Sequence, residues 1–171
     1  MIRRLLFRLW GLHKEDYLIR IGEHGKPLVE SRFTVWYNLS HSGDYIVAAF
    51  SHLEVGIDIE QKRKARMEVA RRFFHPAEIQ CLQNLAGDAQ DDWSVKESFL
   101  KYTGSGLSSP LSGFEVRFDG HRPRIFQSEN LRNLSISACP VDPAYKCFVC
   151  AETTEEPGIF PFLVPDLFLP D

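Results

Sequence analysis

Two carboxylates stand two positions apart in the segment VGIDIEQ, residues 55–61, where apolar and polar residues alternate as in a β-strand. Asp58 and Glu60 would therefore share one face of the strand, about 6–7 Å apart, a distance at which they repel each other unless a cation lies between them. Mg²⁺ suits such a pair, because it accepts one or two carboxylates and completes its shell with water and phosphate oxygens. On the same face, Gly56 would leave room for the close approach of a ligand. The alternative is an edge strand whose polar face is solvated.

A second group of chemical interest lies in WSVKESFLK, residues 93–101. In a helix, Trp93, Glu97 and Lys101 fall at positions i, i+4 and i+8 and form one stripe, which Lys96 and Leu100 border. The tryptophan indicates that this stripe faces protein, so its charged groups need partners. We predict that Glu97 binds a metal and Lys101 a phosphate. The alternative is an exposed ion pair worth about 0.2–0.5 kcal/mol.

Two further segments carry weaker signals. NLSHSGD, residues 38–44, is expected to connect two strands, and its Ser40, His41 and Ser42 could contact a phosphate or a ribose. The alternative for His41 is a structural role. GEHGKP, residues 22–27, is expected to be a loop that carries Lys26.

The elements that position these residues predict a single α+β domain. The chain would open with an amphipathic helix that has Ile2, Leu5, Leu6 and Leu9 on one side and Arg4 and Arg8 on the other. Further helices are expected at 67–74, 76–85 and 92–102, and strands at 33–37, 45–51, 54–60, 113–118, 124–127, 134–138 and 145–151. The tail, residues 153–171, is too rich in proline for a regular element.

Composition narrows the function classes. The 171 residues are 44% hydrophobic and 12% aromatic, as in a globular domain, and the net charge of −3 disfavours nucleic-acid binding. No apolar stretch has the length of a membrane span, so we expect a soluble, cytoplasmic protein without membrane partners. One basic stretch, QKRKARMEVARRFF, residues 61–74, is either a solvated helix face or a docking site for an acidic partner.

The four cysteines do not predict a metal site or a secreted disulfide framework. Cys147 and Cys150 lie three residues apart in an expected strand and would point to opposite faces, so they could not chelate one zinc ion. Cys139 is too isolated to complete a ligand set, and Cys81 lies far away along the chain. The number and placement of the cysteines therefore do not indicate a secreted scaffold stabilised by disulfides.

Several motifs, in this order and at these separations, resemble those of the 4'-phosphopantetheinyl transferases of the surfactin-synthetase-activating (Sfp) type. They are GKP, NLSHSGDYIVAAF, GIDIE, RFFHPAE, WSVKESFLKYTGSGLS and, more weakly, VDPAYKCFVCAE. The resemblance implies transfer of phosphopantetheine from coenzyme A to a serine of an acyl or peptidyl carrier protein, with release of 3',5'-ADP. It also implies a fold of two similar α+β halves related by a pseudo-twofold axis, with coenzyme A bound between them.

Residue roles follow from the resemblance position by position. Asp58, Glu60 and Glu97 would hold Mg²⁺, Lys101 would contact the phosphate under attack, and Glu97 would also accept the serine proton. Coenzyme A would be bordered at its adenine by Gly25, Lys26, Pro27 and Ser40, and His41 would reach a phosphate. The basic stretch after Glu60 would lie near the carrier protein.

The chain departs from the family pattern at its beginning. Family members carry a further segment upstream that includes a first strand, and this chain starts inside what would be the following helix. We therefore expect a domain over residues 1–152, with an incomplete first half at about 1–60 and the second half at about 61–152. Leu5, Leu6 and Leu9 would then lack their partner. Three explanations stay open: a truncated sequence, a homo-oligomer that covers that side, or a degenerate relative. Position 24 is also histidine where the family commonly has tyrosine.

Two alternatives to the transferase remain open on sequence alone. Asp44 followed by Glu60, Gln61 and Lys62 resembles the D…E-x-K pattern of metal-dependent nucleases, although it leaves residues 93–101 unexplained. The other alternative is a non-catalytic relative that binds coenzyme A or a carrier protein only.

Overall fold

The computed structural model describes residues 1–22, 25–62, 67–85, 89–106, 109–120, 122–126, 134–153 and 158. Its elements are α1 (Ile2–Trp10), η1 (Lys14–Asp16), β1 (Leu18–Ile21), β2 (Pro27–Glu30), β3 (Thr34–Ser42), β4 (Tyr45–Ser51), β5 (Val55–Gln61), α2 (Met67–Phe73), α3 (Pro76–Leu85), α4 (Ala89–Thr103), η4 (Leu111–Gly113), β6 (Glu115–Asp119), β7 (Arg122–Phe126), β8 (Leu134–Ala138) and β9 (Tyr145–Glu152).

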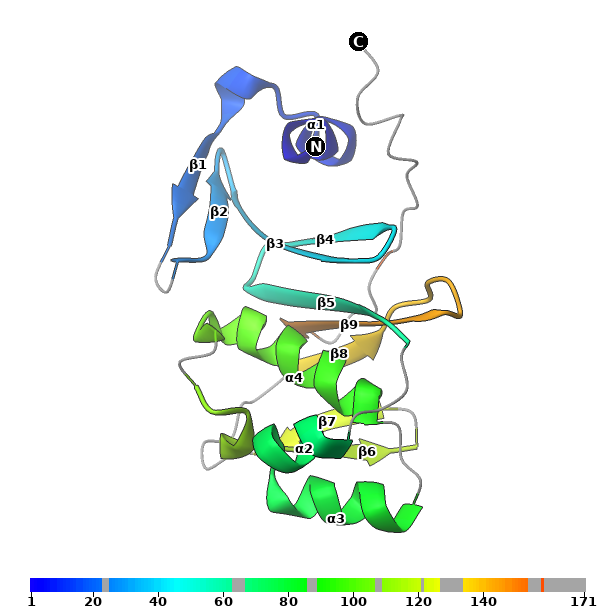
Figure 1. Ribbon diagram of the computed structural model, residues 1–171. Coiled ribbons are helices and arrows are strands. Elements are labelled where there is room, and N and C mark those ends of the chain that lie inside the picture. The colour runs from blue at the N-terminus through cyan, green and yellow to red at the C-terminus, as the bar shows by residue number, and fades with distance from the viewer. Residues whose placement is uncertain are drawn as a thin grey trace.

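These elements stack in layers (Figure 1). Helix α1 covers a four-stranded sheet of order β1-β2-β3-β4, below which lies a three-stranded sheet of order β5-β9-β8. Helix α4 covers the opposite side of the second sheet, and the β6–β7 hairpin, α2 and α3 lie beyond it. All strand pairs are antiparallel. The predicted α+β class is confirmed.

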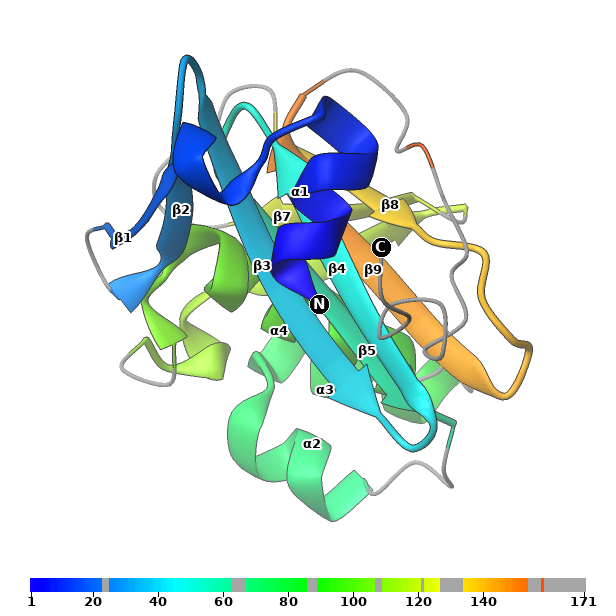
Figure 2. The same cartoon turned by 90° about the horizontal axis from the view of Figure 1, so that it is seen from above.

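Helix α1 packs its apolar side onto the first sheet, and Figure 2 shows it lying over β3 and β4. Leu5 and Leu6 are buried, and Leu6 belongs to a cluster with Val29 and Val35 of the sheet. The expectation that Leu5 and Leu6 lack a partner is therefore wrong, because the first sheet itself covers them.

Two strands escaped the sequence prediction, and a third is longer than expected. Strands β1 and β2 precede the first strand that alternation had indicated, and β2 includes Pro27 of the expected loop. Residues 38–42, expected to be a connection, continue β3 as far as Ser42. These residues are largely polar, so the strand could not be predicted from alternating apolar residues. In the fold, their side chains have a specific role.

That role is to join the two sheets. Three side chains of β3, spaced two residues apart, accept backbone N–H groups from the edge of β5 that does not face β9. Asn38 Oδ1 accepts from Ile57 at 3.0 Å, Ser40 Oγ from Ile59 at 3.3 Å, and Ser42 Oγ from Gln61 at 3.0 Å. Side chains thus replace a backbone ladder at this edge and satisfy its donors.

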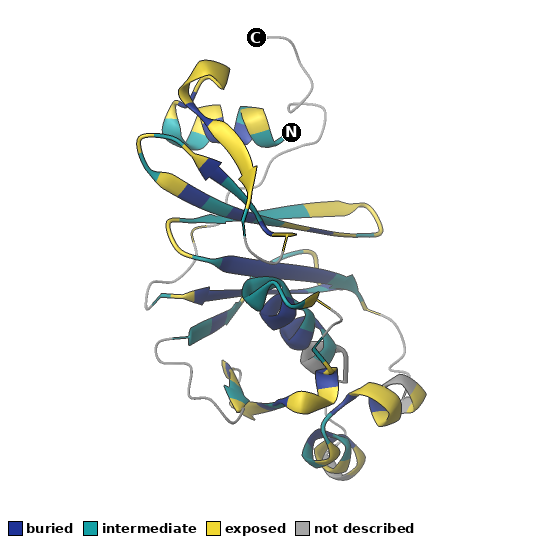
Figure 3. Cartoon of the chain, turned by 90° about the vertical axis from the view of Figure 1, so that its left-hand side faces the viewer, coloured by how far each residue is buried: buried dark blue, intermediate teal, exposed yellow. Residues whose placement is uncertain are grey.

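Strand β5 is buried on both faces because α4 covers the side that carries Asp58 (Figure 3). Gly56 makes this packing close: a Cβ there would overlap the carbonyl oxygen of Ser98 and the amide nitrogen of Tyr102. The prediction that Gly56 leaves room for a ligand is wrong, since the backbone of α4 fills that space. The solvated edge strand is excluded as well, because Asp58 is only 3% exposed.

Candidate active site

Lys101, Asp58 and Ser40 meet where α4, β5 and β3 come together. The ammonium of Lys101 donates to Asp58 Oδ1 at 2.8 Å and to Ser40 Oγ at 2.9 Å. The Ser40 hydroxyl in turn donates to the same carboxylate oxygen at 3.0 Å. Three residues separated by up to 61 positions therefore form one polar group.

Glu97 lies close enough to this group to be affected by its charges. Burial raises the pKa of Glu97, the negative charges of Asp58 and Glu60 raise the pKa further, and Lys101 opposes them. Asp58 and Glu60 of β5 thus share one electrostatic environment with Glu97 of α4. A carboxylate with a raised pKa is suited to accepting a proton during a reaction.

One carboxylate oxygen of the group, on Asp58, is suited to binding a cation. The second oxygen of Asp58, Oδ2, is buried and has no hydrogen-bond partner in the described part of the chain. Among the described residues, no three carboxylate, histidine or cysteine side chains gather closely enough to enclose a metal ion. Here the Lys101 ammonium balances the Asp58 charge, and Oδ2 keeps its capacity to bind a cation.

The GKP segment reaches the same end of α4. Lys26 is buried, and its ammonium donates to Glu54 Oε2 at 3.0 Å and to the carbonyl oxygen of Tyr102. Burial lowers the pKa of Lys26, and Glu54 opposes this shift. Gly25, with φ of +77°, allows the tight turn before Pro27. The loop is thereby fastened one residue beyond Lys101.

The structure does not bring His41 to the Lys101 group. His41 is exposed, and because successive residues of a strand point to opposite faces, its side chain leaves β3 on the side away from Ser40.

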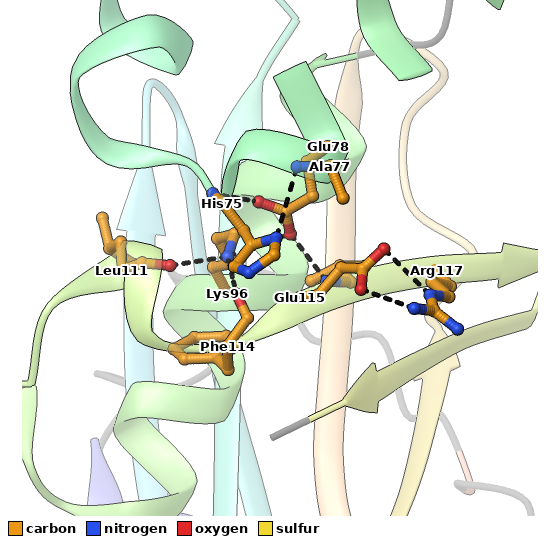
Figure 4. Close-up of polar contacts among 9 residues, drawn as sticks. His75, Ala77, Glu78, Lys96, Leu111, Phe114, Glu115 and Arg117 are labelled. Atoms are coloured by element: carbon orange, nitrogen blue, oxygen red, sulfur yellow. Dashed lines mark hydrogen bonds and ion pairs between the residues drawn. The ribbon is translucent and has the colours of Figure 1, made fainter. Parts of the chain in front are cut away.

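Trp93, a member of the predicted helix stripe, and Lys96, which borders that stripe, differ in outcome. Trp93 is half-buried against Phe73 and Phe74, which confirms that the stripe faces protein. Lys96, expected only to border it, is fully buried. Its ammonium pairs with Glu78 at 2.9 Å and donates to the carbonyl oxygens of Leu111 and Phe114, as Figure 4 shows.

Sequence analysis missed this buried pair, although a signal for Glu78 exists. Glu78 follows His75 by three residues at a helix start, and its carboxylate accepts the backbone N–H of His75 at 2.7 Å. The same carboxylate accepts the N–H of Val116 at 2.6 Å. The spacing indicates the helix cap but does not reveal the lysine.

The other residues that the sequence singled out are the pair of the nuclease alternative and the basic stretch. Asp44 and Lys62 are exposed, and the Lys62 N–H donates to the carbonyl oxygen of Ala144. Within the basic stretch, Arg71 and Arg72 are exposed on α2, whereas Arg63, Lys64 and Arg66 lie outside the described residues. No helix in the described ranges is long and apolar enough to cross a membrane.

Comparison with known proteins gives a consistent family match. The model of the 4'-phosphopantetheinyl transferase superfamily matches residues 54–150, which include β5, α4 and most of β9. The 4'-phosphopantetheinyl transferase Sfp of Bacillus subtilis is 37% identical over 164 residues, covering 92% of this chain and 73% of that protein.

More distant relatives carry the same description. The 4'-phosphopantetheinyl transferase gsp of Aneurinibacillus migulanus is 31% identical, covering 88% of this chain and 65% of that protein. The 4'-phosphopantetheinyl transferase AcpT of Escherichia coli K12 is 32% identical, covering 71% and 65%. Among solved structures, the holo-[acyl-carrier-protein] synthase of Thermotoga maritima aligns with a TM-score of 0.48 at 17% identity, covering 57% of this chain and 61% of that chain.

Proposed function

Because the chain belongs to the 4'-phosphopantetheinyl transferase superfamily, we propose that Asp58, Glu60, Glu97 and Lys101 form its active centre. The protein is an enzyme that transfers the 4'-phosphopantetheine of coenzyme A to carrier proteins. One observation supports the assignment most: Lys101 of α4 and Asp58 of β5 meet at 2.8 Å, beside Glu97.

The chemistry divides between two side chains of α4. A carrier-protein serine attacks a phosphorus of coenzyme A, its oxygen forms the new P–O bond, and the bond to 3',5'-ADP breaks. Glu97 accepts the serine proton at a carboxylate oxygen, directly or through water, and its raised pKa suits this role. Lys101, partly exposed at 28%, turns its ammonium to a phosphoryl oxygen and stabilises the charge that grows there.

Asp58, Glu60 and Glu97 would hold Mg²⁺ as the cofactor. Support comes from the unpartnered, buried Oδ2 of Asp58 and from the negative charges of Asp58 and Glu60, which raise the pKa of Glu97. The ion, when bound, would neutralise charge on the coenzyme A pyrophosphate.

Coenzyme A would be bordered at its adenine by Gly25, Lys26, Pro27 and Ser40, with His41 reaching a phosphate. Support for the first four is positional, because Ser40 touches Lys101 and Lys26 binds the carbonyl of Tyr102. The Lys26 ammonium already has protein partners, so backbone groups of the loop would make the adenine contact. For His41, the exposed side chain would have to approach the ligand from the far side of β3.

The carrier protein would dock near the basic residues that follow Glu60, since opposite charges speed encounter and fix orientation. We also propose that the fold divides near residue 60 into two halves related by a pseudo-twofold axis. A homo-oligomer belongs to the same proposal, and light scattering of the purified chain tests it directly.

The active-centre assignment is tested by mass spectrometry of an apo carrier protein incubated with coenzyme A and Mg²⁺. Wild-type enzyme should add one phosphopantetheine, whereas Glu97→Gln and Lys101→Ala should each lower kcat by about 10²–10³-fold. Glu30→Gln, at an exposed position of β2, is the control and should retain full activity. Normal turnover in either active-centre variant would refute the role given to it.

The same assay separates the transferase from a non-catalytic relative. Binding of coenzyme A by the wild-type chain, measured by calorimetry, without product on any carrier protein tested, would favour a protein that only binds.

A further inference from the structure

Cys139 and Cys147 face each other at one end of the second sheet. Cys139 directly follows β8, and its N–H donates to the carbonyl oxygen of Cys147 at 2.8 Å. The neighbouring pair is Ala138 with Phe148, so the antiparallel register sets the two cysteines opposite each other. Hydrogen-bonded opposite residues have Cα atoms about 5.5 Å apart, which lies within the range that a disulfide spans.

The two thiols share one environment but differ in access. Both belong to the cluster built around Ile57, Ile59 and Tyr145. Cys147 is only 3% exposed, whereas Cys139 is half-buried. A hydrogen bond joins the two side chains; it lowers the pKa of Cys139 and raises the pKa of Cys147, and burial also raises the latter.

The other two cysteines provide a contrast within the same chain. Cys150 is fully buried and belongs to a different cluster, with Val95 and Phe99, on the other face of β9. This confirms that Cys147 and Cys150 point to opposite faces. Cys81 is exposed on α3. Among the four cysteines, all of which the structure describes, only the pair at the end of β8 sets a partly exposed cysteine directly opposite a buried one.

We propose that Cys139 and Cys147 are a peroxide-oxidisable pair, in which Cys139 reacts first and Cys147 resolves the product into a disulfide. The Cys139 thiolate attacks a peroxide oxygen, the O–O bond breaks, and a sulfenic acid and hydroxide form. The Cys147 sulfur then attacks the Cys139 sulfur, the S–O bond breaks, and a second hydroxide leaves. The two thiol protons neutralise the two hydroxides, so two thiols and one hydrogen peroxide become one disulfide and two waters.

The site lies one strand from the proposed active centre. Cys147 is paired with Ile59 of β5, the residue between Asp58 and Glu60. Oxidation of the pair would thus cross-link the end of β8 to the strand that holds β5 in place.

The test uses the full chain, treated with hydrogen peroxide, denatured, alkylated and digested without reduction. Mass spectrometry should find Cys139 and Cys147 joined in one peptide pair, two hydrogen masses lighter than the thiols, and dithiothreitol should reverse this. Cys81→Ser is the matched control and should form the same disulfide. In Cys147→Ser, the oxidation should stop at a Cys139 sulfenic acid, which dimedone traps.

Cys139→Ser should oxidise at position 147 about tenfold more slowly, because its remaining thiol is buried and mostly protonated. Should Cys147→Ser fail to fold, the wild-type disulfide map still decides the matter. Oxidation of Cys81 that leaves Cys139 and Cys147 fully alkylated would overturn the proposal, as would dimedone labelling of Cys147 before Cys139.

Discussion

The ion pair of Lys101 and Asp58 combines a partly exposed ammonium with an almost completely buried carboxylate. The side chain of Lys101 is 28% exposed, whereas that of Asp58 is 4% exposed. An ammonium in this position can turn toward a bound phosphate, but the buried carboxylate then needs another cation, because an unpaired buried charge is costly. The geometry therefore links phosphate binding by Lys101 to cation binding by Asp58.

Ser40 offers a test at the scale of a single hydroxyl. Ser40→Ala and Ser42→Ala each remove a group that accepts a β5 N–H, so each should lower the free energy of unfolding by about 1–3 kcal/mol. Only Ser40 also touches Lys101 and Asp58. Ser40→Ala should therefore lower kcat about tenfold while Ser42→Ala keeps it, as measured by denaturant unfolding and the carrier-protein assay. Equal kcat in both variants would remove Ser40 from the active centre.

At the scale of elements, the contact between α4 and β5 brings Glu97 and Lys101 to Asp58. Helix α4 buries Val95, Phe99 and Leu100, and the opposing strand has a glycine where the two backbones meet. The chemistry therefore depends on how closely a helix can approach a strand.

Gly56→Ala tests this approach. The added methyl group would force α4 away from β5, so we expect a loss of about 1–3 kcal/mol or more in the free energy of unfolding. We also expect lower kcat, because Lys101 would move relative to Asp58. Gly113→Ala is the control, since a Cβ there meets only Pro110 at 3.5 Å. A Gly56→Ala protein of wild-type stability would contradict the close packing.

The buried pair of Lys96 and Glu78 ties three elements together, α3, α4 and the segment from η4 into β6 (Figure 4). Lys96→Met would leave the Glu78 carboxylate without its cation in a buried site. We expect a loss of about 3–5 kcal/mol in the free energy of unfolding, measured with denaturant. Lys14→Met, at an exposed position, should change it by less than about 0.5 kcal/mol. A small effect at Lys96 would mean that Glu78 is neutral in the fold.

At the scale of the whole molecule, charge is unevenly placed although the net charge is only −3. Exposed arginines lie on α2 at one end of the layered structure, and others lie on α1 at the opposite end (Figures 1 and 3). An acidic carrier protein would approach the first end, which adjoins the basic stretch that follows Glu60.

Charge reversal distinguishes the two ends. Arg71→Glu with Arg72→Glu should raise the apparent KM for the carrier protein, most strongly at low salt, because exposed charges act over about 10 Å at 0.1 M ionic strength. Arg3→Glu with Arg8→Glu makes the same change in net charge on α1 and should leave KM unaltered. Charge reversal at Arg63, Lys64 and Arg66 should raise the apparent KM, as reversal at Arg71 and Arg72 does. Equal KM values at low salt for both double variants would exclude docking at α2.

Local pattern was sufficient for the elements that carry the chemistry. Alternation in residues 55–61 identified β5, and helical spacing in residues 93–101 identified α4, because periodicity depends on neighbours in the chain alone. The motifs in these two segments also carried the family resemblance. By contrast, the second half of β3 could not be predicted, because its residues are largely polar and lack the apolar alternation typical of a half-buried strand.

The sequence by itself therefore determined the class of fold, the family, and the helix and strand on which the reactive groups stand. Only the tertiary structure decided which side chains meet: Ser40 with Lys101, Lys96 with Glu78, and the empty side of Gly56 with the backbone of α4. These contacts join residues 18 to 61 positions apart, and their formation depends on how layers pack, which no local period encodes.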